Sequence, residues 1–396
     1  MGAIGIHKAR IVYESAISPK MQRLNVNSKE NIRDTYDVGI SECLTPMLRS
    51  EWIRLWENSD EGHFFNSPEC FESFLEALHI ETYRIVTCRQ NDALCAVLPL
   101  VRSRMFGTSV WTAAGKEGNY VDKPPFLLMS EDPGLFGALL DAASSLGNIC
   151  LPEVHERKKE LFSGLESSQL LFEPVSVNRF AELSPELEIL RFSSSSQKRK
   201  MRSGVRSGMQ AWKHEFVIFT DDFAAALRTV MDVEARSSKA KRHMAFFGKE
   251  INRKIFDAFL KHAPDFLNFA VLYSDGHPIA TSAGFVYKGI FTGYHSSFDE
   301  AYRRQFPGKL LVFYLLERLK SDGYHAVDFL RGDSDVKRLF ADEISMQYDV
   351  MISRNCLYLS WWKISFTVRR QIKLAIAVAR SVERSILRRF EKNEKR

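Results

Sequence analysis

Residues 267–296 read LNFAVLYSDGHPIATSAGFVYKGIFTGYHS and give the clearest indication of the fold. Two polar turns, Ser274 to His277 and Lys288-Gly289, divide it into three apolar segments, 267–273, 279–287 and 290–296. Apolar runs of this length between Gly-containing turns are typical of antiparallel strands. The stretch therefore predicts a three-stranded meander.

The chain downstream of the meander alternates between helical and strand patterns. Pro307-Gly308 opens a helix that Asp322-Gly323 closes, with apolar positions at helical spacing at Leu311, Tyr314, Leu315 and Leu319. A strand at 325–330, a turn at 332–334, a short helix through Lys337 and Phe340 and a strand near 347–352 follow. This order predicts a mixed α/β (α+β) unit.

An N-terminal stretch repeats the pattern. Phe64-Phe65 precedes a helix and two strands, as Phe246-Phe247 does in the second half. We therefore predict tandem domains, each a mixed, mostly antiparallel sheet flanked by helices. The predicted divisions are an irregular extension at 1–35, domains at 36–185 and 186–355, and a basic amphipathic helical tail at 356–396.

The positive charge is confined to the tail. The net charge is +6, but from Arg354 onward twelve Lys/Arg stand against three Asp/Glu, which leaves the rest of the chain at −3. A mildly acidic body argues against a broad nucleic-acid footprint, so we expect no nucleic-acid partner.

Several functional classes lack their motifs. The six cysteines show no C-x-x-C spacing, and no zinc, Walker or Rossmann pattern is present, so no metal is expected. The N-terminus has no apolar signal region, and no run of 18 apolar residues occurs. These observations predict a cytoplasmic protein.

One basic stretch suggests a phosphate site. A helix N-terminus with nearby cations can hold a diphosphate without a metal. The segment before the helix at Pro307 fits that requirement through Arg303, Arg304, Gln305, Phe306, Gly308 and Lys309. The alternative is a solvated basic loop. The matching first-half segment, Ser130 to Gly134, keeps Pro-Gly but carries Glu131 and Asp132, whose carboxylates repel phosphate, so only the second half is expected to bind one.

The segment 294–337, with its Pro-Gly helix start and GYHAVDFLRGDSDVK, resembles the acetyltransferase-like proteins of bacterial cellulose and exopolysaccharide synthesis, the CelD type of the GNAT superfamily, related to Fem transferases. FFNSPECFESFLEAL and LCAVLPL extend the likeness to roughly residues 40 to 355. The resemblance implies a GNAT fold in each half. It also implies acetyl-CoA or another acyl-CoA as donor and a sugar or cell-envelope precursor as acceptor.

The GNAT phosphate loop usually has the form Q/R-x-x-G-x-G/A, and Leu310 departs from it here. Direct attack on a thioester needs a base, an acid and oxyanion donors. Asp328 lies inside an apolar strand, as a reacting group or as a structural carboxylate bonded to backbone or Arg331. Asp333 and Lys337 follow that strand, and Lys337 matches a functional lysine of Fem-type enzymes; its alternative is a surface lysine.

Two further catalytic candidates lie on the third meander strand. Tyr294 and His295 lie beside the expected thioester path, and the near-neutral pKa of histidine suits a base; the alternative is a structural role. On a separate basic helix, Lys198, Arg202 and Arg206 are candidates to bind an acceptor phosphate, or form a solvated face.

The tail alternates apolar and basic positions at helical spacing after Trp361-Trp362. It either lies on an anionic membrane surface, so that the protein is peripheral at the inner membrane, or packs across the two halves. Two rival functions remain open: a Fem-like aminoacyl-tRNA-dependent transferase, and a catalytically degenerate scaffold in polysaccharide synthesis.

Overall fold

The computed structural model describes residues 36–184, 195–210 and 213–394. The extension predicted at 1–35 lies outside the described residues, as does the start of the predicted second domain at 186–194.

The first half contains seven strands and three α-helices among the described residues. Its strands are β1 (Asp37–Ser41), β2 (Tyr83–Gln90), β3 (Ala93–Met105), β4 (Thr108–Thr112), β5 (Leu127–Leu128), β6 (Ile149–His155) and β7 (Leu170–Glu182). Its α-helices are α1 (Pro46–Asn58), α2 (Pro68–Ala77) and α3 (Pro133–Ser145). Short 3-10 turns are η1 (Phe64–Asn66), η2 (Glu156–Gly164) and η3 (Ser167–Gln169).

The second half follows the predicted order. Its strands are β8 (His214–Phe219), β9 (Leu267–Ser274), β10 (His277–Tyr287), β11 (Ile290–Phe298), β12 (Ala326–Arg331) and β13 (Glu343–Ile352). Its helices are α4 (Ser195–Gln210), α5 (Phe223–Ala235), α6 (Ser238–Lys241), α7 (Glu250–His262), α8 (Pro307–Ser321), α9 (Asp335–Phe340) and the tail helix α10 (Cys356–Glu394), with turns η4 (Pro264–Phe266) and η5 (Glu300–Gln305). The predicted meander is β9, β10 and β11.

One continuous sheet joins the two halves, in the order β1-β2-β3-β4-β6-β13-β7-β12-β11-β10-β9-β8, with β5 pairing β3. The last strand of each half pairs with the other half, because β13 lies between β6 and β7, and β7 pairs β12. The division predicted near residue 185 therefore splits the chain without splitting the sheet. The fold class is the predicted mixed α/β arrangement of two tandem units.

An aromatic core fills the space between the halves, where α2 packs on α7. The rings of Phe64 and Phe285 stack with centroids 3.6 Å apart, and Phe74 meets Phe259 edge-on at 5.6 Å. Edge-on ring pairs such as Phe74 with Phe259 add to the energy of apolar burial. Phe64, the start of the first sequence repeat, thus joins the core that fixes the relative position of the two halves.

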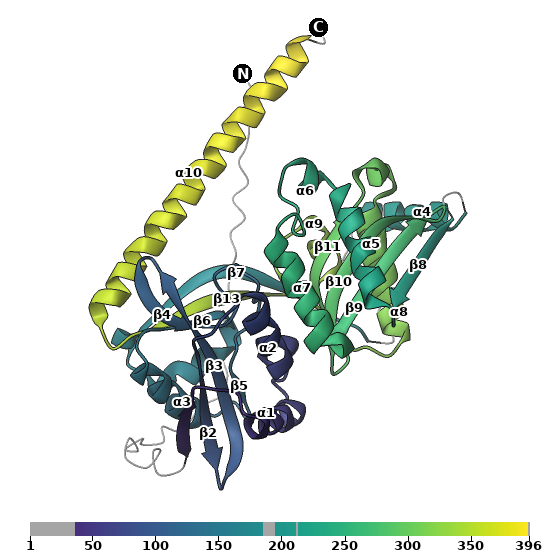
Figure 1. Ribbon diagram of the computed structural model, residues 1–396. Helices are drawn as coiled ribbons and strands as arrows, with labels where there is room; N and C mark the ends of the chain where they lie inside the picture. The colour runs from purple at the N-terminus through teal and green to yellow at the C-terminus, as the bar shows by residue number, and fades with distance from the viewer. Residues whose placement is uncertain (1–35, 185–194, 211–212, 395–396) are drawn as a thin grey trace, which may run out of the picture.

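The tail helix α10 begins on the first half and then extends away from the body (Figure 1). Leu359, Trp362 and Phe366 are buried on a small cluster with Val110, Cys150 and Met351. An exposed apolar stripe runs along α10, made of Leu357, Trp361, Ile364, Val368, Ile372 and Ile376. None of the helices within the described ranges has the length and apolar content to cross a membrane.

Candidate functional site

Two neighbouring strands of the second half separate and open a pocket. β11 and β12 pair in parallel only at Ile290–Ala326, Phe291–Val327 and Thr292–Asp328. Beyond these pairs β11 carries a bulge, because the register with β10 shifts between Ala283 and Gly284. β12 bends at the same level, where Leu330 adopts a left-handed backbone with φ 56°. The bulge and the bend drive the strands apart.

The resulting splay pocket has a volume of about 410 Å³. Its walls come from β11, the end of β12, the start of α8, and helices α6 and α9. The lining residues used below are Lys239, Tyr294, His295, Gly308 and Lys337. The pocket therefore brings together Tyr294 and His295 from the meander strand and Lys337 from the segment after β12. It also includes Gly308 from the predicted phosphate site.

The start of α8 is open toward the splay pocket. Its N-cap residue, Phe306, has a left-handed backbone with φ 55° and makes no side-chain cap. Gly308 lies so close to Phe298 that an added Cβ would come within 3.3 Å of that ring. Pro307 has no N–H, and the Lys309 and Leu310 N–H groups donate to Phe306 O at 3.0 and 3.1 Å. Within the described part of this helix start, the Gly308 N–H is therefore the donor left for an anion.

The cations of the phosphate stretch differ in their availability. Arg303 is paired with Glu300 at 3.1 Å, and Gln305 contacts His214 Nε2 at 3.3 Å. Among the described residues, neither Arg304 nor Lys309 has an ion pair within 4.0 Å. Arg304 and Lys309 are thus the cations that remain for a diphosphate.

Lys337 has its ammonium group inside the fold. Its Nζ donates to the backbone oxygens of Leu330 at 3.2 Å and Arg331 at 2.5 Å. Burial lowers the pKa of Lys337, while Asp122 and Asp328 act to raise it. An ammonium has three N–H donors, so two fixed bonds leave one donor for a ligand. The surface-lysine alternative does not describe this environment.

A second lysine of the splay pocket was not predicted from the sequence. Lys239 on α6 donates to Ser296 O at 3.0 Å, and burial lowers its pKa. It lies in a polar segment, Ser237 to Lys241, that looks like any exposed turn. No sequence signal marked it.

His295 is a wall of the pocket and a poor base. Burial and the nearby Lys239 lower its pKa to about 3, so its ring is neutral at pH 7. The ring packs against Phe246 and Phe247, with centroids 5.2 and 5.1 Å away, and its Nε2 lies 3.4 Å from a Glu234 carboxylate oxygen. The base role expected from an ordinary histidine pKa does not fit this environment.

Tyr294 belongs to the aromatic core as well as to the pocket. Its hydroxyl donates to Tyr120 O at 2.9 Å, and its ring meets Phe285 and Phe246. Burial raises the pKa of Tyr294 well above its usual value. A fixed hydroxyl bonded across to the first half suits positioning rather than proton transfer.

Asp328 is a fully satisfied carboxylate. Lys123 pairs with it at 2.7 Å, Asn178 donates at 3.0 Å, and the Leu330 N–H donates at 2.8 Å. Burial acts to raise its pKa, but these partners outweigh burial and the pKa is lowered. The structural alternative is the one this geometry supports, with Lys123 in place of the expected Arg331.

Asp333 lies at the surface of the turn after β12. Arg179 and Arg338 hold it at 2.7 and 3.0 Å, and the hydrogen bonds from Arg338 and Arg179 lower its pKa. Through these two arginines Asp333 links β7 to α9. It does not line the splay pocket.

The predicted acceptor residues lie on α4, away from the splay pocket. Arg202 and Arg206 line a shallow hollow of about 480 Å³ with Arg199 and small polar residues of the same helix. The side chain of Lys198 lies outside the described residues.

A buried polar network behind the pocket was missed by sequence reasoning. Arg331 pairs with Asp122 and, at 3.3 Å, with Glu153; Lys116 pairs with Asp349 at 2.6 Å. Burial raises the pKa of Asp122 to about 6 and of Glu153 to about 7. The signal that drew attention to Asp328, a carboxylate inside an apolar strand, is also present at Glu153 in ICLPEVH and at Asp349 in QYDVMI.

The matching helix start of the first half is closed. Asp132 caps α3 by accepting from the Gly134 N–H at 2.8 Å and also accepts from Tyr36 Oη at 2.8 Å. Lys158 bridges Glu131 and Glu61 beside it. These carboxylates occupy the position that an anion would need at this helix start.

Comparison with known proteins agrees with this geometry. Residues 195–338 match the acetyltransferase (GNAT) domain family. The structure of FemX superposes with a TM-score of 0.59 at 9% identity, over 81% of this chain and 99% of that one. A conserved protein of unknown function from Bacteroides thetaiotaomicron superposes with a TM-score of 0.53 at 11% identity, over 80% of this chain and 100% of that one. Comparison with curated proteins gives no match.

The match over residues 195–338 supports a transferase whose second half resembles GNAT acetyltransferase domains, a family that uses acyl-CoA as co-substrate. The chain as a whole has the two-unit fold that FemX also has. The likeness to FemX concerns the fold alone, because the identity is low.

Proposed function

We propose that the protein is an acyl-CoA-dependent N- or O-acyltransferase, most simply an acetyltransferase, whose donor binds in the splay pocket. One observation carries the proposal: α8 begins without a side-chain cap, at Gly308 on the pocket, beside the available cations Arg304 and Lys309. That arrangement provides for a diphosphate, and the separated strands provide a slot for the attached acyl arm.

Lys337 is the proposed acid of the transfer. The acceptor amine or hydroxyl attacks the thioester carbon, and the C–S bond breaks as the new C–N or C–O bond forms. The third N–H of Lys337, whose pKa burial lowers, gives its proton to the leaving thiolate, and the proton that the acceptor loses passes through solvent to restore the lysine ammonium. Neutral His295 and fixed Tyr294 shape the slot.

The acceptor in this proposal is a sugar or cell-envelope precursor, as the resemblance to CelD-type proteins suggests. α10 carries both an exposed apolar stripe and several basic residues, a composition that suits a helix lying on an anionic membrane. Peripheral contact with the inner membrane is therefore part of the proposal.

A Fem-like aminoacyl-tRNA-dependent transferase is the second candidate, favoured by the TM-score of 0.59 to FemX. It would use the same pocket with a different donor, whereas a degenerate scaffold would bind neither donor.

Titration with acetyl-CoA while monitoring thermal unfolding tests the proposal. We expect stabilisation of the wild type that saturates, because a ligand that binds only the folded state raises its stability. The variant Arg304→Ala/Lys309→Ala should lose that stabilisation, and Arg318→Ala, an exposed cation at the far end of α8 paired with Asp322, should keep it. Equal stabilisation of the two variants would contradict the proposed donor site.

A further inference from the structure

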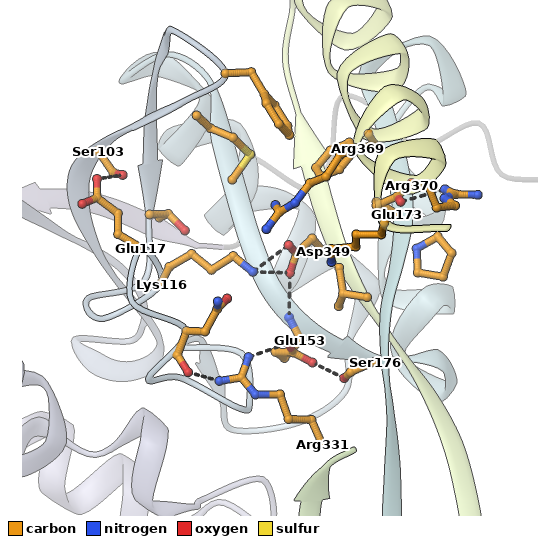
Figure 2. Close-up of a pocket in the computed structure, with 18 of the residues that line it drawn as sticks. Ser103, Lys116, Glu117, Glu153, Glu173, Ser176, Arg331, Asp349, Arg369 and Arg370 are labelled. Atoms are coloured by element: carbon orange, nitrogen blue, oxygen red, sulfur yellow. Dashed lines mark hydrogen bonds and ion pairs between the residues drawn. The ribbon is translucent and has the colours of Figure 1, made fainter. Parts of the chain in front are cut away.

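A second, larger cavity lies under α10, outside the splay pocket (Figure 2). This α10 cavity has a volume of about 1080 Å³ and is walled by β3, β4, β6, the exchanged strands β7 and β13, and α10. It forms because the first half repeats the splay of the second. β4 and β6 pair in parallel only at Trp111–Ile149 and Thr112–Cys150.

The backbone of β6 explains why the strands separate. Glu153 has a left-handed backbone with φ 52°, and the register between β6 and β13 shifts between Tyr348 and Val350. Glu153 occupies the place in β6 that Leu330 has in β12. As Figure 2 shows, the side chains of Lys116, Glu153 and Asp349 lie together in the opened space.

Each of the four carboxylates that line the cavity is already bonded, Glu117 as acceptor from Ser103 Oγ. Asp349 is paired with Lys116 at 2.6 Å, Glu173 with Arg370 at 2.7 Å, and Glu153 accepts from Ser176 Oγ at 2.6 Å. The acidic side chains of the floor therefore do not neutralise further cations. They hold the floor in place.

Three cations at the rim have no such partners. Within the part of the chain that the structure describes, Arg104, Arg369 and Lys373 make no ion pair shorter than 4.0 Å. They come from two elements, β3 and α10, and Arg369 points from α10 into the cavity (Figure 2). Leu359, Trp362 and Phe366 fix the start of α10 to the body, so the basic positions face the cavity.

Uncompensated guanidinium and ammonium groups around a polar hollow favour an anion with several acceptor oxygens. We propose that the α10 cavity binds the phosphate or diphosphate group of a ligand, held by Arg104, Arg369 and Lys373. The polar floor around Glu153 and Ser176 accommodates the group attached to that phosphate.

The cavity is connected to the splay pocket through one residue. The Arg331 side chain lines the α10 cavity, and its backbone oxygen accepts from Lys337 Nζ at 2.5 Å. A ligand of the α10 cavity thus lies one residue away from the proposed acid. The identification of this ligand as the acyl acceptor rests on the proposed function. The proposal that the cavity binds phosphate is independent of the proposed function.

Calorimetric titration with inorganic diphosphate tests the inference. The background variant Arg304→Ala/Lys309→Ala is used throughout, so that the start of α8 does not contribute. We expect binding that Arg369→Gln/Lys373→Gln weakens by about tenfold or more, since loss of one charge-assisted contact costs at least about 1.4 kcal/mol. Lys363→Gln, an exposed cation of α10 outside the cavity, should bind as the background does.

A second arm identifies the source of the phosphate. Vesicles of phosphatidylcholine with phosphatidate carry the same group in a lipid headgroup, and binding to them that depends on Arg369 and Lys373 indicates a lipid ligand. If Arg369 and Lys373 affect the binding of diphosphate but not of vesicles, the ligand is a soluble phosphate compound. Failure of both probes to bind, or equal binding by the Arg369→Gln/Lys373→Gln and Lys363→Gln variants, would overturn the inference.

The proposed acetyl-CoA site and the proposed phosphate site can be tested separately. In an otherwise wild-type chain, Arg369→Gln/Lys373→Gln should leave the thermal stabilisation by acetyl-CoA unchanged. A loss of acetyl-CoA stabilisation in this variant would place CoA itself in the α10 cavity and contradict the separate phosphate site.

Discussion

Two residues in left-handed backbone positions shape the two hollows of the molecule. Leu330 and Glu153 have φ of 56° and 52°, each in the strand that separates from its parallel neighbour. A left-handed conformation is unfavourable for residues other than glycine and persists where the surrounding structure enforces it. In both halves this position directs the following backbone around the hollow.

Glu153 makes protein stability depend on pH. Burial raises the pKa of Glu153 to about 7 from the ordinary 4.5. The folded state therefore binds more protons than the unfolded state between these values, and stability falls as pH rises through that window. Glu153→Gln removes this loss. Chemical unfolding at pH 5 and pH 8 should show the variant gaining roughly 1–3 kcal/mol over the wild type at the higher pH.

The control for this measurement is Glu160→Gln, a nearby exposed glutamate on η2. Its stability relative to the wild type should be the same at both pH values. A Glu153→Gln variant that also shows no change with pH would mean that Glu153 is ionised at little cost in the folded state.

At the residue level, the sequence draws attention to an unusual residue in a regular pattern without settling its role. Asp328 was singled out because it interrupts an apolar strand, and it is buried with a full set of partners. Its partner Lys123 could not be predicted, since it comes from an irregular segment of the other half. The low pKa of His295 was equally hidden, because it depends on Phe246 and Phe247 closing over the ring.

At the scale of elements, α10 combines two surfaces with different partners. Its first turns are anchored by buried Trp362, whose indole N–H donates to Thr108 at 2.9 Å. Farther along, Ile364, Val368 and Ile372 remain exposed at 57%, 51% and 55%. An exposed apolar stripe on a basic helix suits the peripheral membrane contact proposed above.

Val368→Asp should weaken binding to anionic vesicles by about tenfold, because burial of one valine contributes roughly 1.5 kcal/mol or more. Thr367→Asp adds the same charge at an exposed position beside the stripe and should have a smaller effect. Vesicle flotation measures both variants. Equal loss of binding in the two would indicate attraction by charge alone, without insertion of the stripe.

Most elements of the second half could be predicted from the sequence. The predicted helix closed by Asp322-Gly323 is α8, which ends at Ser321, and the predicted turn at Lys288-Gly289 joins β10 to β11. Local turn chemistry and helical spacing determine these boundaries. The left-handed N-cap at Phe306 could not be predicted, because it depends on packing around α8 rather than on local preference.

At the scale of the whole molecule, the repeat indicated two units but not how they join. The exchange of β7 and β13 depends on pairing between strands far apart in sequence, which no local pattern encodes. The exchange has a functional consequence. It places Asn178 of β7 against Asp328 and Ser176 of β7 against Glu153, so the same strand supports both hollows.

The most direct test of the account is a crystal structure of the protein with acetyl-CoA. The account predicts the diphosphate at the start of α8 beside Arg304 and Lys309, with the thioester between β11 and β12 near Lys337. Acetyl-CoA bound in the α10 cavity or at the start of α3, with the splay pocket empty, would contradict it.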